Sequence, residues 1–558
     1  MLKSFRTLAF ATALPAVAFI LEASPVQAVT FNLLEATVPE IQSAIDAELI
    51  TSESLVQQYL NRIAAYDDAG PMINSIIQLN PNALQTARAL DMQRSQLSGP
   101  RSPLYGIPIL LKDNIDTFDL PTTAGALILE GSIPPDDAFI TQQLRDAGAI
   151  ILGKANLTEF ANFVAFDMPN GFSAVGGQTL NPYGPGVFDV GGSSSGPAAA
   201  IAANLAPLSI GTETSGSILS PASSNSLVGI KPTVGLISRD GIIPISATQD
   251  TAGPITRTVE DAAILLGALT GVDPSDPATA ASVGKSFKDY TPFLKLDGLE
   301  GKRLGVLRDP FFTDFLSDDE QALSERAFND LERLGAELVD PVEFPTPGQL
   351  FGLGFDVLLY EFNVGVKDYL ASLGDDAPAT TLADIVAFNE ANPDEAIPFG
   401  QEILELSVDT GGDLSDPEYL EALETGIRRT ATEGVDVLLE SLDLDALLFP
   451  NNLAAFAGAR PGYPSITVPA GYTSEGEPFG LTFLSDAFSE PELIELAYAY
   501  EQGTLRRRPP ASTPAIAGDR VSVPEPSTAT VLIVFALGAI TWQRRNRGTG
   551  GDTPAYQG

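Results

Sequence analysis

Serine and lysine side chains, in three separate segments, carry the chemistry that this 558-residue chain could perform. The sequence contains no cysteine and no histidine. These absences exclude a thiolate nucleophile, an imidazole base, and any metal site that needs thiolate or imidazole ligands. Covalent catalysis would therefore need a serine or threonine nucleophile, with lysine, a carboxylate, tyrosine or serine moving the proton.

The first segment is a lysine, Lys112, at the end of the apolar run 107–111. The run is typical of a buried strand, and two interpretations of its last residue remain open. Lys112 could extend its ammonium group to solvent along the strand end. Alternatively, burial could lower its pKa toward neutrality, which would allow the amine to act as a base.

The second segment is Gly-Gly-Ser-Ser-Ser-Gly at 191–196, which precedes an alanine-rich stretch at 197–205. Runs of glycine and serine are often flexible linkers. Pro197, however, is a residue type favoured at the first position of a helix. The sequence is therefore equally compatible with an ordered loop that joins a strand to a helix over 197–205.

The third segment is Gly-Thr-Glu-Thr-Ser-Gly-Ser at 211–217. Small residues before a serine allow several backbone N–H groups to converge on one point, as an oxyanion hole requires. Taken alone, the same residues could form an ordinary tight turn.

Together the three segments resemble the amidase signature family, and further matches extend over nearly the whole body of the chain. These are Gly-Ile-Pro at 106–108, Gly-Ile-Lys-Pro-Thr at 229–233, Ser-Arg-Asp-Gly-Ile-Ile-Pro at 238–244, Asp-Thr-Ala-Gly-Pro at 250–254, and Pro-Ser-Ile-Thr-Val-Pro-Ala-Gly at 464–471. The stretch 211–245 is most similar to the branch that contains bacterial peptide amidases. The resemblance also accounts for the missing histidine, because this family uses a Ser–cis-Ser–Lys triad.

The resemblance implies a role for each matching residue. Ser217 corresponds to the nucleophile, Ser193 to the cis-serine that relays the proton, and Lys112 to the base. The two serines lie 217 − 193 = 24 residues apart, the spacing that the family pattern implies. The backbone N–H groups of Thr214, Ser215, Gly216 and Ser217 would form the oxyanion hole.

The activity implied is hydrolysis of a carboxylic amide or a C-terminal peptide amide to an acid and ammonia, through an acyl-enzyme and without a cofactor. Two alternatives remain open: a catalytically inert surface or matrix protein on an amidase scaffold, and a transamidation subunit of the same family. The substrate and the oligomeric state are left open, and in this family specificity resides in the variable middle, here within 273–440.

The elements that must position these residues indicate a single α/β domain over 29–510. The resemblance implies a mixed central sheet covered by helices on both faces. We expect strands at 107–111, 149–152, 227–231 and 446–449, and helices at 197–205 and 259–269. Helical spacing of apolar residues between 41 and 63 predicts an opening helical hairpin with Thr51 as a helix cap. Residues 273–440 are more acidic, and we expect them to be more helical.

The two ends of the sequence carry signals for export. A basic start, an uncharged run at 8–21 and Val-Gln-Ala at 26–28 predict a signal peptide over 1–28. The composition of residues 511–522 is typical of a linker. Residues 523–558 resemble a PEP-CTERM sorting tag, with a short transmembrane segment at 528–542 followed by arginines. The expected location is periplasmic, cell-surface or extracellular, with membrane attachment until a sorting protease acts.

The net charge of −41 argues against nucleic acid and anionic lipid surfaces as partners, because both require a basic face. Gly284-Lys285-Ser286 lacks the first glycine of a phosphate-binding loop, since residue 279 is threonine. The acidic clusters lack the spacing of a calcium loop. We therefore predict neither a cofactor nor a metal.

Overall fold

The computed structural model describes residues 29–94, 96–97, 99–308, 315–345 and 354–523. The predicted signal peptide and the predicted membrane segment 528–542 lie outside the described residues. Within the described ranges, no helix combines the length and apolar character needed to cross a bilayer. The chain divides into two compact units, of which the larger comprises residues 32–519. A separate two-stranded sheet pairs β1 (Val29–Asn32) with β15 (Arg520–Val523).

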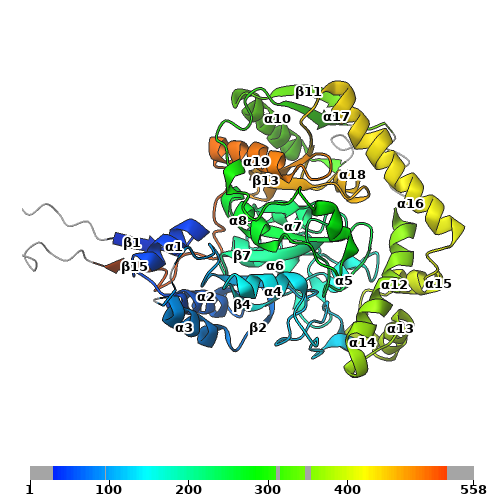
Figure 1. The fold of residues 1–558 in the computed structure, drawn as a ribbon, viewed down its shortest axis with the longest axis horizontal. Helices are drawn as coiled ribbons and strands as arrows, with labels where there is room; N and C mark the ends of the chain where they lie inside the picture. The colour runs from blue at the N-terminus through cyan, green and yellow to red at the C-terminus, as the bar shows by residue number, and fades with distance from the viewer. Residues whose placement is uncertain (1–28, 95, 98, 309–314, 346–353, 524–558) are drawn as a thin grey trace, which may run out of the picture. The chain divides into compact units, whose positions relative to one another are not determined.

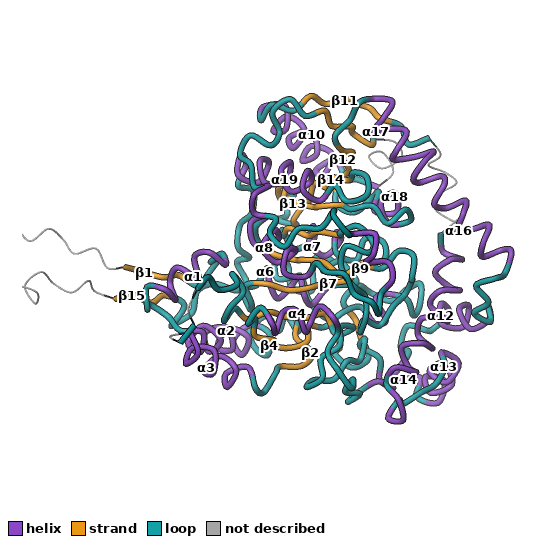
Figure 2. Tube along the Cα trace, in the orientation of Figure 1, coloured by secondary structure: helices purple, strands orange, loops and turns teal. Residues whose placement is uncertain are grey.

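An eleven-stranded mixed sheet forms the centre of the larger unit (Figures 1 and 2). Its parallel pairs are β3–β4, β3–β7, β10–β11 and β10–β12, and the other neighbours are antiparallel. In spatial order the strands are β11 (Glu337–Val342), β10 (Arg303–Leu307), β12 (Ala446–Pro450), β14 (Pro478–Leu484), β13 (Ser465–Tyr472), β8 (Val228–Lys231), β9 (Thr251–Thr256), β7 (Leu208–Glu213), β3 (Pro108–Lys112), β4 (Ile150–Ala155) and β2 (Ile76–Leu79). A short hairpin pairs β5 (Phe172–Ser173) with β6 (Gly177–Gln178).

Helices pack on the sheet in two groups, which confirms the predicted α/β fold with a mixed, helix-flanked sheet. One group consists of helices that contact one another in succession, namely α4 (Phe139–Asp146), α8 (Val259–Leu269), α19 (Glu490–Thr504) and α10 (Asp318–Arg333). The other group is α6 (Ser195–Ala202) with α7 (Leu219–Ser224). Every residue of α6 is buried, so this alanine-rich helix lies in the interior of the unit.

The predicted strands and helices correspond to β3, β4, β8, β12, α6 and α8, with ends that differ by at most a few residues. The opening hairpin is α1 (Val38–Asp46) and α2 (Ser52–Tyr66), where the Thr51 side chain accepts the Ser54 N–H, and α3 (Ala83–Arg94) packs against α2. Helix α6 begins at Ser195, before the predicted start at Pro197. The first turn tolerates this proline because its N–H groups have no partner inside the helix.

Residues 273–440 contain two strands that the helical interpretation missed, β10 and β11. Their sequences are short and partly charged, so they resemble loop segments until the sheet supplies neighbours. The region also contains α10, at the top of Figure 1, and a later group of helices at the right and upper right of that figure. Its helices are α12 (Phe355–Ser372), α13 (Leu382–Ala391), α14 (Pro393–Ala396), α15 (Glu402–Asp409), α16 (Pro417–Thr430) and α17 (Asp436–Leu442). Helix α12 contacts α13, α15 and α16 and contributes Phe362 and Val366 to an apolar cluster.

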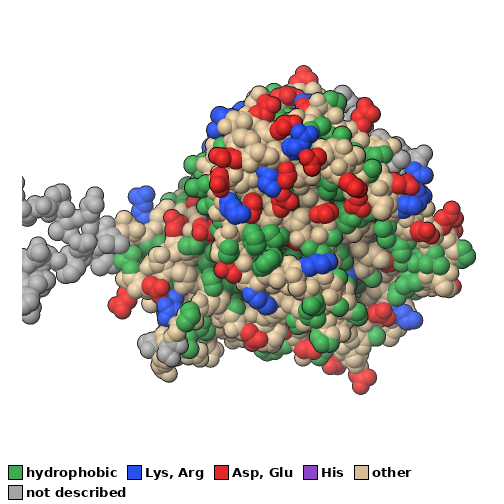
Figure 3. Space-filling model, turned by 45° about the horizontal axis from the view of Figure 1, so that its top comes forward, with side chains coloured by type: hydrophobic (Ala, Val, Ile, Leu, Met, Phe, Trp, Pro, Cys, Tyr) green, Lys and Arg blue, Asp and Glu red, His purple; other side chains and the backbone are tan. Residues whose placement is uncertain are grey.

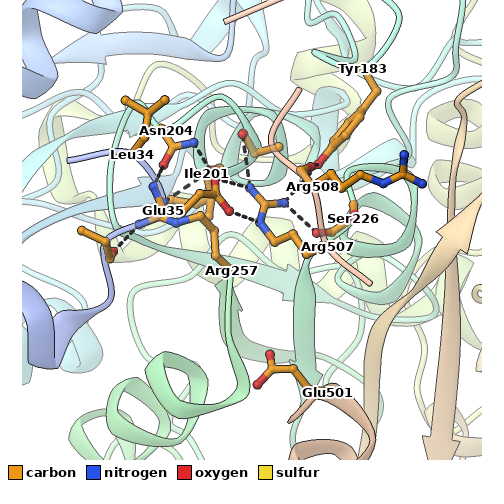
Figure 4. Close-up of polar contacts among 12 residues, drawn as sticks. Leu34, Glu35, Tyr183, Ile201, Asn204, Ser226, Arg257, Glu501, Arg507 and Arg508 are labelled. Carbon is orange, nitrogen blue, oxygen red and sulfur yellow. Dashed lines mark hydrogen bonds and ion pairs between the residues drawn. The ribbon is translucent and has the colours of Figure 1, made fainter. Parts of the chain in front are cut away.

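Three arginines hold the C-terminal end of α6, and Figure 4 shows two of them, Arg257 and Arg507. Arg257 donates to the Ile201 and Ala206 carbonyls, and Arg507 donates to the Ala202 carbonyl and to both carboxylate oxygens of Glu35. Arg62 donates to the Ala203 and Asn204 carbonyls. The last carbonyls of a helix lack partners within it, and burial removes water as an alternative. The arginines therefore satisfy a buried helix end and fix the helix that follows the Gly/Ser loop.

Residues 513–519 contact the body, although the sequence assigned 511–522 to a linker. Arg62, which is fully buried, forms an ion pair of 2.7 Å with Asp519 and donates to the Thr513 and Pro514 carbonyls. The Ser512 hydroxyl donates to the Pro182 carbonyl. These bonds extend the folded body to Asp519, in agreement with the boundary of the larger unit.

Acidic side chains are spread over the face shown in Figure 3, among basic, apolar and uncharged ones. Their distribution fits the net charge of −41. Such a charge is expected to keep molecules apart in solution.

Candidate active site

Lys112 ends β3 as a fully buried side chain, so it does not reach solvent. Its Nζ donates to Ser193 Oγ at 2.8 Å, to Thr212 Oγ1 at 2.9 Å and to the Thr212 carbonyl at 3.3 Å. Burial lowers the pKa of Lys112 to about 7, while the carboxylates of Asp250 and Glu213 oppose that shift. A large fraction of the amine is therefore neutral near pH 7, as a base requires.

The Gly/Ser segment is an ordered loop and not a flexible linker. The Gly192–Ser193 peptide bond is cis, and the Ser193 carbonyl accepts the Thr158 N–H at 3.0 Å. Ser194 Oγ donates to the Thr212 carbonyl at 3.1 Å and accepts the Thr212 N–H at 3.2 Å, which ties the loop to β7. Gly191 has a φ of +69°, and a Cβ there would lie 2.7 Å from Pro221 Cα. This position can accept only glycine without rearrangement.

Ser217 lies in the turn between β7 and α7 with 8% of its surface exposed. Its carbonyl accepts the Ser194 N–H at 3.1 Å, so the turn and the Gly/Ser loop are directly bonded. The structure thus joins Lys112 to Ser193 through side chains and joins Ser217 to the same loop through the backbone.

Glu213 organises the turn that contains the predicted oxyanion hole. Its carboxylate accepts the Gly216 N–H at 2.7 Å and the Ile218 and Leu219 N–H groups at 2.7 and 3.0 Å. Gly216 was one of four predicted donors, and its N–H is already occupied. Among the described residues, the N–H groups of Thr214, Ser215 and Ser217 have no such acceptor.

Asp250 connects the turn to the loop that follows β8. One carboxylate oxygen accepts the Thr214 hydroxyl at 2.5 Å, and the other accepts the Ile245 and Ser246 N–H groups at 2.7 and 2.8 Å. Burial raises the pKa of Asp250 to about 6, although these hydrogen bonds favour the charged form. The carboxylate therefore holds Thr214 in position beside the turn.

A cavity of about 470 Å³ adjoins this site. Asn114, Thr212 and Thr214 line it on the side of the sheet, and residues 239–247 form a second wall. The third wall is one face of α12, at the helical spacing of Glu361, Val364, Gly365, Asp368, Tyr369 and Ser372. Lys112, Ser193 and Ser217 are not in the lining. Thr212, which does line the cavity, hydrogen-bonds directly to Lys112.

Sequence reasoning assigned no role to Asn114, Thr212, Glu213 or Asp250. Asn114 Nδ2 donates to Thr212 Oγ1 at 3.1 Å, so it supports the same hydroxyl that Lys112 contacts. The available signal was local, because Thr212 and Glu213 lie in the third segment and Asn114 lies two residues after Lys112. A buried glutamate in a turn of small residues would have suggested a backbone-binding role.

Comparisons with known proteins show similarity to amidases along most of the chain. A family model described as Amidase matches residues 54–461. The native peptide amidase from Stenotrophomonas maltophilia shares 46% identity with the chain, and the match covers 86% of this chain and 99% of that structure with a TM-score of 0.82. A probable amidase of Arabidopsis thaliana is 42% identical over 86% of this chain and 92% of its own length. A glutamyl-tRNA(Gln) amidotransferase subunit of Synechococcus sp. is 33% identical, over 85% and 94% respectively.

Proposed function

The chain belongs to the amidase family and is an amide-hydrolysing enzyme, and from that premise we propose that it converts a carboxylic or C-terminal peptide amide to an acid and ammonia. The observation that carries this proposal is the contact between Lys112 and Ser193, in which a buried amine with a pKa of about 7 donates to a serine hydroxyl. Similarity to a peptide amidase supports the choice of substrate class.

The proposed reaction begins with proton transfer toward the buried lysine. Neutral Lys112 accepts the hydroxyl proton of Ser193, and Ser193 in turn accepts the hydroxyl proton of Ser217. At the same time the Oγ of Ser217 forms a bond to the amide carbonyl carbon. The carbonyl oxygen gains negative charge, which the free N–H groups of Thr214, Ser215 and Ser217 stabilise. The relay then protonates the leaving nitrogen, the C–N bond breaks and ammonia departs. Water hydrolyses the resulting ester on Ser217 and regenerates the hydroxyl.

Ammonia release by the purified full-length protein tests the proposal. The panel contains amidated peptides, aliphatic and aromatic amides, and glutamine. Ser217→Ala should abolish release from every substrate that the wild type cleaves. A serine acyl-enzyme should also appear as a mass increase on the peptide that contains Ser217 after acid quenching.

Ser224→Ala is a suitable matched control, because Ser224 is the last residue of α7 and has no proposed role in proton transfer or in holding the Gly/Ser loop. Release should persist in this variant. Activity that survives Ser217→Ala would reject Ser217 as the nucleophile. A folded wild type that is silent on the whole panel would instead favour an inert scaffold.

A transamidation subunit is the less favoured alternative, although the chain resembles an amidotransferase subunit. Its identity with that protein is 33%, compared with 46% for the peptide amidase. Ammonia release from glutamine without release from amidated peptides would support the alternative.

Export forms part of the proposal and rests on the sequence of the two ends. We propose that residues 1–28 direct secretion and that 523–558 hold the protein in the membrane until a sorting protease removes them. Fractionation of the producing cell, with mass spectrometry of both termini, tests this. Full-length protein recovered from the cytoplasm would contradict it.

A further inference from the structure

The walls of the cavity beside Thr212 carry far more negative than positive charge. Five acidic residues line it, Asp240, Asp250, Asp276, Glu361 and Asp368, against one basic residue, Arg239. Arg239 is already paired, because it contacts Asp276 at 2.6 Å and 2.8 Å. No basic side chain in the lining is therefore left to attract an anionic ligand.

The acidic residues divide into two sets by their partners. Asp250 accepts three hydrogen bonds from neutral donors, and Glu361 accepts the hydroxyls of Ser246, Thr248 and Tyr419. Asp240 and Asp368 are exposed, and among the described residues no donor contacts their carboxylates. Partial loss of solvent, with the neighbouring carboxylates of Asp273, Asp136 and Asp276, raises the pKa of Asp240. A cation bound there would relieve this repulsion.

A separate observation indicates that the cavity receives a ligand. Asn114, which lines the cavity with only 3% of its surface exposed, has an Oδ1 atom without any hydrogen-bond partner. Its Nδ2 is occupied by Thr212 Oγ1 and the Ile243 carbonyl, so the amide orientation is determined. A buried acceptor is rarely left unsatisfied in a folded protein. The N–H of a bound amide would satisfy it.

The position of the cavity identifies which part of the substrate it holds. Ammonia, the proposed leaving group, needs little space, whereas the acyl portion contains all other atoms of the substrate. The cavity reaches the site through Thr212, which contacts Lys112, and Thr214, which lies three residues before Ser217. The acyl portion therefore occupies the space between residues 239–247 and α12.

Resting on the proposed function, we propose that this cavity selects amides whose acyl portion carries an alkylammonium or guanidinium group. Asp240 and Asp368 attract the cation, and Asn114 Oδ1 accepts an N–H of the same substrate. The cation could be a basic side chain or a free α-ammonium group, which share this chemistry.

Steady-state kinetics on dipeptide amides tests the proposal with the full-length protein. N-acetylated substrates carry Lys, Gln or Glu before a common amidated leucine, and a second set with free N-termini separates the α-ammonium from the side chain. We expect kcat/KM for Lys to exceed that for Gln by about tenfold, with Glu lowest. Equal values for the three side chains, together with no gain from a free N-terminus, would overturn the proposal.

Two substitutions test whether Asp240 and Asp368 produce the preference for a cationic side chain. Asp240→Asn and Asp368→Asn should each lower the Lys-to-Gln ratio of kcat/KM by about threefold, since each removes one partly exposed charge. A folding defect would lower kcat/KM for the Lys and Gln substrates equally and leave their ratio unchanged. Asp394→Asn, an exposed residue of α14 outside the cavity, is the matched control and should keep the wild-type ratio. Equal loss of the ratio in this control would assign the preference to overall charge.

The inference and the proposed function fail in different ways. Hydrolysis without a charge preference would reject only the inference. Absence of hydrolysis from every amide would reject the proposed function, and calorimetric titration of the same Lys and Glu peptides into the Ser217→Ala variant would still measure the charge preference. Equal affinities in that titration would reject the inference as well.

Discussion

Two buried lysines lie at or next to the ends of neighbouring parallel strands, and their side chains have different partners. Lys112 in β3 and Lys154 in β4 are both fully buried. Leu111 pairs with Lys154 across the two strands, so Lys112, one residue further, points to the opposite face of the sheet. Lys112 contacts hydroxyls and a carbonyl, whereas Lys154 forms an ion pair of 3.2 Å with Asp113.

The partners, and not burial alone, separate the lysine that we propose as the base from the lysine that forms an ion pair. A carboxylate beside a buried ammonium group favours the charged form, while neutral partners leave the cost of burial uncompensated. Lys112 therefore loses its proton readily, and its hydroxyl partner belongs to the loop with the other candidate residues. Lys154 also donates to Thr122 Oγ1 and the Pro121 carbonyl, as expected for a structural cation.

The largest contrast should appear when Lys112 is replaced. Lys112→Met should reduce kcat/KM by about 10⁴-fold, because the relay loses its base. Its stability should change less than its activity, since methionine is similar in length to a neutral lysine. Kinetics and thermal unfolding on the same preparations measure both effects. Activity within about tenfold of wild type would remove Lys112 from the mechanism.

Lys154→Met should mainly reduce stability, in contrast to the loss of activity expected for Lys112→Met. It leaves the Asp113 carboxylate buried without its cation, so the free energy of unfolding should fall by about 3–5 kcal/mol. Denaturant titration measures the loss. The double variant with Asp113→Asn should recover part of it, because the buried charge is gone. An equal loss of stability in Lys112→Met and Lys154→Met would erase the distinction between the two sites.

The pH dependence of kcat/KM in the wild type tests the role proposed for Lys112. Because the pKa of Lys112 is lowered to about 7 and the proposed mechanism needs the neutral amine, kcat/KM should rise through that pH. Below it, the rate should fall about tenfold per pH unit. An uncharged amide substrate keeps substrate ionisation out of the profile. A rate that is flat between about pH 5.5 and 8 would contradict this assignment.

The free energy of unfolding should also depend on the protonation of Lys112. The folded pKa of Lys112 lies below the ordinary value of 10.5, so between about 7 and 10.5 the unfolded chain binds the proton and the folded chain does not. The free energy of unfolding should therefore gain a contribution that increases with pH in that window. Lys112→Met should lack this contribution in a comparison of urea titrations at several pH values.

The smallest expected effect concerns Glu159, a buried carboxyl with no cation among its described partners. Burial raises its pKa to about 8, although the Ala174 N–H that it accepts opposes the shift. Its contribution to stability is complete below its ordinary pKa of 4.5 and is lost as the pH rises through about 8. Glu159→Gln should remove about 1 kcal/mol of the pH dependence between about pH 6.5 and 7.5. Identical pH profiles of stability for variant and wild type would contradict a raised pKa.

The sequence predicted the α/β class and several elements because their signals are local. The apolar run before Lys112 and the helix at 259–269 carry their periodicity in a few consecutive residues. Strands β10 and β11 carry no such local pattern, since they form by pairing, β11 with β10 and β10 with β12. Local patterns also could not predict that Arg62, Arg257 and Arg507 meet at α6. Arg62 and Arg507 are more than 400 residues apart in the sequence.

The sequence by itself determined which chemistry is available: no thiol and no imidazole, a lysine at a strand end, and serines in two glycine-containing loops. Only the tertiary structure decided which lysine meets a serine, which backbone N–H groups Glu213 occupies, and which carboxylates face the cavity. The reason is physical. The pKa of an amine depends on the solvent it loses and the charges it meets, and both are set by residues distant in the chain.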